Sequence, residues 1–144
     1  VHVPYKGTGH AVVDLVAGQI NLMFDSLSTV IPNEKAGKVR MIGLTSSQRS
    51  AAAPQFPTLH ELGVTGYEAT GWFGFATNTG VPQDIIQKLN SEIDRIIRTP
   101  EMQERLVGFG SDLVGGSPET FRAFIASEAD KWGKVIRQAN IKAQ

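Results

Sequence analysis

Residues 17–26 have the sequence AGQINLMFDS, and residues 36–46 have the sequence AGKVRMIGLTS. In each stretch a glycine follows a helical pattern, a short apolar run comes next, and polar residues close the segment. Glycine supplies the left-handed conformation that ends a helix, and an unbroken apolar run is typical of a strand buried on both faces. Strands that alternate with short helices pair in parallel, because parallel strands need crossover connections. The repeated pattern therefore predicts an α/β fold.

The same alternation begins at the start of the chain. Residues 1–5 are rich in β-prone side chains, and a helical pattern follows from His10 to Ala17. A second helix is expected over residues 26–36, between strands at residues 20–26 and 39–44. The predicted order is therefore a parallel β-α-β-α-β core with right-handed crossovers.

Polar residues close each of the three predicted strands, at residues 5–9, 24–28 and 44–46. The carboxyl ends of parallel strands lie along one edge of a sheet, and ligands of open α/β sheets bind there. We therefore expect a ligand site at this edge.

The first strand end is a glycine-bearing turn, Lys6-Gly7-Thr8-Gly9-His10, that leads into a helix. Backbone N–H groups at the positive end of a helix dipole suit a carboxylate or a phosphate. The turn has neither the dinucleotide fingerprint nor the P-loop pattern, so a nucleotide is poorly supported. The simpler interpretation is a tight turn in which Thr8 is only the N-cap.

The second strand end is Asp25-Ser26-Leu27-Ser28. One of these side chains caps the following helix in the simpler interpretation. Asp25, Ser26, Ser28 and Thr29 exceed what one cap requires, which favours a ligand. Asp25 is suited to accept a hydrogen bond from a ligand hydroxyl, an amine or a bound water. A catalytic acid or base is the weaker interpretation, because no second titrating partner is evident nearby.

Composition excludes several other classes of function. The 144 residues include 14 basic and 14 acidic side chains, so no net field favours nucleic acid as a partner. There is no cysteine for thiolate chemistry or zinc, and the three histidines lack metal-ligand spacing. No serine lies in a nucleophile elbow. We expect no catalytic residue, metal or cofactor.

The second half of the chain changes in character. From residue 81 onward it consists of amphipathic helical patterns, with starts indicated by Pro82, by Thr99-Pro100 and by Ser117-Pro118. Only residues 112–114 form a candidate strand there. We place a boundary near residues 70–78, and we expect these helices to pack on a sheet supplied by residues outside this sequence.

Several motifs in this order resemble a known family, the extracytoplasmic solute receptors of tripartite tricarboxylate transporters, called the Bug family. The resemblance covers nearly the whole chain. It is carried by VPYKG at residues 3–7, AGQINLMFD at 17–25, AGKVR at 36–40, GYEATGWFG at 66–74, residues 82–90, and VGGSPE at 114–119.

The resemblance implies a periplasmic receptor with a type II periplasmic binding protein-like fold. Two α/β lobes would close on a small organic acid and deliver it to membrane permease subunits. The family's receptors are about twice as long as this chain, so the resemblance implies a truncated, C-terminal half. Residues 1–72 would form most of the second lobe, and residues 73–144 the hinge and the C-terminal helical part of the first.

The resemblance also implies a ligand site. Its second-lobe contacts come from loops that match residues 5–9 and 24–28, so the expected ligand-binding residues are Tyr5, Gly7, Thr8, Gly9, Asp25, Ser26 and Ser28. Two alternatives stay open at this point. One is a phosphate-handling α/β enzyme fragment, and the other is a fragment that associates with itself and binds no ligand.

Overall fold

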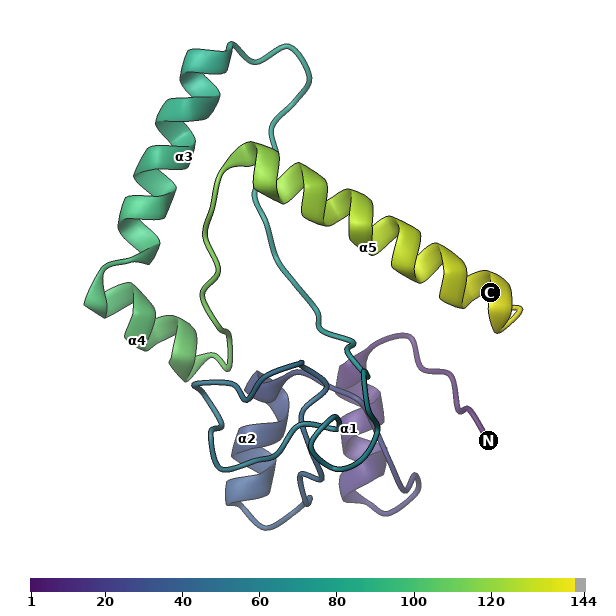
Figure 1. Cartoon of the computed structure of the whole chain (residues 1–144). Coiled ribbons are helices and arrows are strands. Elements are labelled where there is room, and N and C mark those ends of the chain that lie inside the picture. The colour runs from purple at the N-terminus through teal and green to yellow at the C-terminus, as the bar shows by residue number, and fades with distance from the viewer. Residues whose placement is uncertain (142–144) are drawn as a thin grey trace. The chain divides into compact units, whose positions relative to one another are not determined.

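The computed structural model describes residues 1–141, and Figure 1 shows the helices of this range. They are α1 (Thr8–Val16), α2 (Leu27–Lys35), α3 (Gln83–Ile97), α4 (Pro100–Gly108) and α5 (Pro118–Gln138). None of them combines the length and the apolar character that crossing a membrane requires.

Glycines end the first two helices as the sequence predicts. Gly18 has φ of 72° and Gly37 has φ of 69°. The amide after each glycine reaches back into the helix: Gln19 N donates to Asp14 O at 2.8 Å, and Lys38 N donates to Asn33 O at 2.9 Å. This is the hydrogen-bond pattern of a Schellman cap, so both predicted helix ends are confirmed.

The predicted parallel sheet of three strands is wrong for residues 1–141. The described pairing is one isolated parallel bridge between Leu44 and Thr58. Leu44 N donates to Pro57 O, and Leu59 N donates to Leu44 O, both at 2.8 Å. The third predicted strand therefore pairs locally with a segment that follows it and not with the other two.

Exposure explains why the strands do not assemble. A parallel strand is stable when both of its faces are covered. Leu22 and Phe24, from the second predicted strand, are 60% and 64% exposed, and Ile42 from the third is 55% exposed. The apolar runs have strand composition, but residues 1–141 do not supply the layers that would cover them.

The chain divides into two compact units, each described here by itself. Unit 1 comprises Val1–Phe75 and Pro100–Leu113, and unit 2 comprises Ala76–Thr99 and the residues from Val114 onward. The division after Phe75 falls inside the predicted boundary at residues 70–78. Residues 100–113 lie in unit 1, whereas the sequence-based division groups them with the rest of 73–144. The last three residues of that range lie outside the described residues.

The core of unit 1 is small. Its buried side chains are Ala11 from α1, Leu44, Ala53 and Thr58, together with Ser50. Ala53 and Thr58 are completely buried. Thr58 is one of the two bridged residues, and Ala53 lies in the connection between Leu44 and Thr58, so this connection holds the middle of unit 1 together.

Unit 2 contains a buried acidic side chain on α5. Glu128 accepts a hydrogen bond from Trp132 Nε1 at 2.9 Å and pairs with Lys131. The hydrogen bond from Lys131 lowers the pKa of Glu128, so this carboxylate stays ionised although it is buried. Asn90 on α3 donates to Gly116 O at 2.9 Å, which joins α3 to the segment before α5.

Candidate ligand-binding site

The start of α1 presents backbone amides to open space. Gly7 is the N-cap and Thr8 is the first helical residue, so Thr8 is not the cap that the simpler interpretation assigned. Within the described chain no side chain caps this helix, and its first turn carries no acidic residue. A methyl group built on Gly7 or Gly9 would meet no atom within 4 Å. The first amides of a helix have no intrahelical acceptor, so this turn suits an anion.

Tyr5 is placed differently from the glycine turn. Its hydroxyl donates a hydrogen bond to Asp14 Oδ2 at 2.7 Å. Asp14 lies in the last turn of α1, about 9 Å along the helix axis from Thr8 at 1.5 Å per residue. The side chain of Tyr5 therefore fixes the segment before α1 against the helix, and its hydroxyl points away from the helix start.

The start of α2 also lacks a side-chain cap within residues 1–141. Ser26 occupies the N-cap position with extended φ and ψ of −73° and 149°, the geometry in which a serine normally caps. Its hydroxyl instead lies 3.0 Å from Ser28 Oγ and 3.1 Å from Thr29 Oγ1. The structure thus brings Ser26 and Ser28 together as a hydroxyl cluster and leaves the first amides of α2 without a cap.

Asp25 carries an unsatisfied buried oxygen. Its Oδ1 accepts from the backbone N of Ser26 at 2.8 Å. Its Oδ2 is buried and has no hydrogen-bond partner among the described residues. Buried polar atoms in proteins are nearly always paired, because an unpaired one keeps its full desolvation penalty. Asp25 Oδ2 therefore needs a donor, such as a hydroxyl, a protonated acid or a water molecule.

The two helix starts belong to one unit. Both helices lie in unit 1, and Figure 1 shows α1 and α2 beginning at the same end of it. The predicted residues thus form two groups, Gly7, Thr8 and Gly9 at the first start and Asp25, Ser26 and Ser28 at the second. The first group offers amide donors, and the second adds hydroxyls and an acceptor. This combination is suited to a small acid that also carries a donor group.

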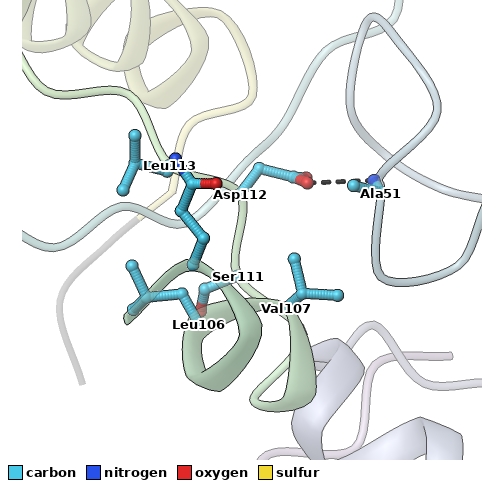
Figure 2. Close-up of a pocket in the computed structure, with 7 residues that line it drawn as sticks. Ala51, Leu106, Val107, Ser111, Asp112 and Leu113 are labelled. Atoms are coloured by element: carbon cyan, nitrogen blue, oxygen red, sulfur yellow. Dashed lines mark hydrogen bonds between the residues drawn. The ribbon is translucent and has the colours of Figure 1, made fainter. Parts of the chain in front are cut away.

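A separate pocket of about 240 Å³ lies in unit 1 (Figure 2). Its lining is mainly apolar and includes Leu106 and Val107 of α4. The carboxylate of Asp112 at its edge accepts a hydrogen bond from Ala51 N at 3.0 Å. None of the predicted site residues lines this pocket, and the one charged group there repels an anion. An acid is therefore better accommodated at the helix starts.

Sequence reasoning missed one residue beside the site. Gly110, just after α4, contacts the first turn of α2, where a methyl group on it would lie 2.9 Å from Ser28 N. The glycine that follows the α4 pattern was a visible signal for a helix end, but nothing in the sequence indicated what it touches. Within residues 1–141 no group of three or more His, Cys, Asp or Glu side chains is arranged to hold a metal ion.

Residues 1–141 match the family described as the tripartite tricarboxylate transporter family receptor. The chain belongs to this receptor family. It is 37% identical over 144 residues to a UPF0065 protein in the tcbD-tcbE intergenic region of Pseudomonas sp. strain P51. It is 33% identical over 140 residues to protein BugT of Bordetella pertussis. The family is one of substrate-binding receptors, not of enzymes.

Solved structures of similar proteins indicate the fold of this chain. R. palustris Rpa4515 with adipate matches 96% of the chain with a TM-score of 0.85 and 32% identity. Periplasmic binding protein BugD matches 99% with a TM-score of 0.80 and 30% identity. MatC of Rhodopseudomonas palustris with bound malate matches 93% with a TM-score of 0.72 and 29% identity. The expected periplasmic binding protein fold is thus supported, although the three predicted strands are not paired with one another within residues 1–141.

The receptor chain spans less than half the length of these relatives. It covers 43% of the Pseudomonas protein and 43% of BugT. It covers 46% of Rpa4515, 48% of BugD and 47% of MatC. Activities and partners of a whole receptor are therefore matters of proposal for this chain.

Proposed function

We propose that this chain is the C-terminal half of a periplasmic receptor that binds a small organic acid between two lobes. The receptor would deliver the acid to the membrane permease subunits of a tripartite tricarboxylate transporter. The proposal rests on one observation: α1 and α2 of unit 1 both start without a side-chain cap, and Asp25, directly before the second start, has a buried carboxylate oxygen with no hydrogen-bond partner among the described residues. The bound adipate of Rpa4515, the bound malate of MatC and the periplasmic description of BugD support it.

The two units correspond to two lobes in this proposal. Unit 1 is most of the lobe that carries the site, and unit 2 is the C-terminal contribution to the other lobe. The segment at residues 70–78, where the chain passes from unit 1 to unit 2, acts as a hinge. The opposite wall of the site comes from the rest of the receptor, in keeping with relatives of about twice this length.

Each predicted residue then has a role. The acid accepts hydrogen bonds from the backbone around Gly7, Thr8 and Gly9, where the helix dipole adds to the attraction. Ser26 and Ser28 donate from their hydroxyl groups, and Asp25 Oδ2 accepts from a ligand hydroxyl or from a water that the ligand traps. Tyr5 contributes indirectly, because its bond to Asp14 holds the turn in place.

Calorimetric titration of the receptor in its full natural length, with adipate and with malate, tests this function. We expect a saturable binding isotherm for at least one acid. Asp25→Asn keeps the shape of the side chain but removes its charge, and it should weaken binding about tenfold, the effect of losing one hydrogen bond to a charged group. Glu34→Gln removes the same charge near the other end of α2 and serves as the matched control.

Two results would count against the proposal. The absence of binding by either acid contradicts a carboxylate receptor, and equal affinities for the Asp25 and Glu34 variants contradict the site. Recovery of chemically unchanged acid after long incubation with stoichiometric protein separates a receptor from the phosphate-handling enzyme that the sequence left open.

Exposed rings favour a second behaviour for the isolated chain. Phe73 and Phe75 are 97% and 77% exposed, and Val114 is 87% exposed. Large exposed apolar side chains drive association in water. The 144-residue chain on its own is therefore expected to sediment as a dimer or larger species. A concentration-independent monomer in sedimentation velocity would show that these side chains do not associate.

A further inference from the structure

Gly110 lies in a turn that packs directly against the first turn of α2. Its φ is 72°, and a methyl group built on it would lie 2.5 Å from Leu27 Cβ, 2.9 Å from Ser28 N and 3.0 Å from the carbonyl carbon of Leu27. Real Cβ atoms do not approach backbone this closely. Only glycine therefore allows the turn after α4 to reach the start of α2.

The turn is also anchored on its far side. Asp112 Oδ1 accepts a hydrogen bond from Ala51 N at 3.0 Å, as Figure 2 shows. Ala51 neighbours Ser50 and Ala53, which are both buried in unit 1. Residues 110–112 are thus held between the connection around Ala51 and the first turn of α2.

We propose that Gly110 is a positioning residue for the acid site. The turn supports the backbone of Leu27 and Ser28, and so it fixes where the uncapped amides of α2 and the neighbouring carboxylate of Asp25 point. This inference rests on the proposed function, because it concerns the same site. It adds a residue from far along the chain that contacts no ligand itself.

The chain offers a closely matched control. Gly18 has the same φ of 72° and ends α1 with the same cap, in which Gly18 N donates to Leu15 O and Gln19 N donates to Asp14 O. At Gly110, Gly110 N donates to Val107 O and Ser111 N donates to Leu106 O. A methyl group on Gly18 meets nothing within 4 Å. Alanine at either position strains the backbone equally, and only at position 110 does it push on α2.

The experiment compares Gly110→Ala with Gly18→Ala in the receptor of full natural length. Affinity for adipate and malate is measured by calorimetry, and the amide resonances of Leu27 and Ser28 are followed by NMR. We expect Gly110→Ala to shift both resonances and to weaken binding about tenfold, as for one lost charge-assisted hydrogen bond. Gly18→Ala should leave both unchanged. Equal resonances and equal affinities in the two variants would overturn the inference.

The readouts separate this inference from the proposed function. If the unsubstituted receptor binds neither acid, the proposed function fails, and the resonances still decide whether Gly110 positions α2. If the acids bind and the resonances shift without any loss of affinity, the function stands and the positioning role in binding is refuted.

A second pair of variants covers the case in which Gly110→Ala does not fold. Asp112→Ala removes the other anchor of the turn, and Asp112→Asn keeps an oxygen that can accept from Ala51 N. We expect the alanine variant to shift the Leu27 and Ser28 resonances and the asparagine variant to leave them in place. Unchanged resonances in Asp112→Ala would contradict the inference.

Discussion

The hydroxyl of Tyr5 donates a hydrogen bond of 2.7 Å to Oδ2 of Asp14, which ties the segment before α1 to the last turn of that helix. We expect Tyr5→Phe and Asp14→Asn each to lower the urea midpoint of unfolding. The double variant should have the same urea midpoint as the less stable of the two single variants, because both changes remove the same bond. Tyr67→Phe, at the other tyrosine of the chain, is the control. Additive losses in the double variant would show that the bond is not the source of the effect.

The same bond has a predictable dependence on pH. The hydrogen bond to Asp14 raises the pKa of Tyr5 above its ordinary value of 10.0, because it stabilises the neutral phenol. A raised pKa in the folded state contributes stability that is fully present below the ordinary value and is lost as the pH rises through the raised one. The difference in urea midpoint between the unsubstituted chain and Tyr5→Phe should therefore be constant at neutral pH and disappear in strong alkali. Urea unfolding of both proteins, followed by fluorescence at a series of alkaline pH values, measures this difference.

An ion pair of unit 1, between Arg49 and Glu61, depends on pH in the acidic range. Arg49 donates to both carboxylate oxygens of Glu61, at 2.7 Å for the shortest bond, and also to Pro54 O. The guanidinium lowers the pKa of Glu61 below its ordinary value of 4.5. A lowered pKa contributes stability above the ordinary value that is lost as the pH falls through the lowered one.

Glu61→Gln should therefore reduce stability at about pH 7 and have less effect in strong acid, once the pH has fallen through the lowered pKa and the native carboxylate is itself protonated. Both side chains are more than 40% exposed, so the effect at neutral pH is expected to be small and to weaken in high salt. Urea unfolding at the two pH values gives the comparison. Glu101→Gln, which removes a more exposed pair with Arg105, should have the smaller effect.

The helix ends show what local sequence determines. Gly18 and Gly37 adopt the left-handed conformation that the repeated pattern predicts. Ala at either position should lower the free energy of unfolding by about 1 kcal/mol, because an L side chain is strained there. Gly7 has φ of 165°, an extended conformation open to any residue, and open space around it. Gly7→Ala should therefore change stability by less than about 0.5 kcal/mol. Chemical denaturation measures all three.

Strand pairing was not predictable in the same way. The signal for a buried strand is an apolar run, and it depends on layers that cover both faces. Leu22, Phe24 and Ile42 carry that signal, yet all are more than half exposed in the described structure. A helix makes its hydrogen bonds within its own segment, whereas a strand needs partners from elsewhere. The helix ends at Gly18 and Gly37 were therefore predicted correctly, and the pairing of the strands was not.

The features of the candidate site also fall into two groups, those that local sequence predicts and those that depend on contacts between distant residues. The positions of the starts of α1 and α2 follow from local signals, the glycine at position 7 and the hydroxyls after Asp25, but the absence of a side-chain cap at either start does not. The contact of Gly110 with Leu27 joins residues far apart in the chain, and no local pattern reports it. Likewise the bond of Tyr5 to Asp14 depends on how the chain enters α1, so the sequence placed Tyr5 at the site without its true partner.

Two serines at helix starts provide a test of whether Ser26 belongs to a ligand site or serves the helix as Ser117 does. Ser117 Oγ accepts from Thr120 N at the start of α5, whereas Ser26 makes no such bond at the start of α2 within the described residues. Ser117→Ala should lower the free energy of unfolding by about 1 kcal/mol and leave acid binding unchanged. Ser26→Ala should change stability by less than about 0.5 kcal/mol and weaken binding of adipate or malate several-fold. Denaturation and calorimetry on the same pair of variants give both numbers. A large loss of stability with unchanged affinity for Ser26→Ala would show instead that the hydroxyl cluster serves the helix and not the ligand.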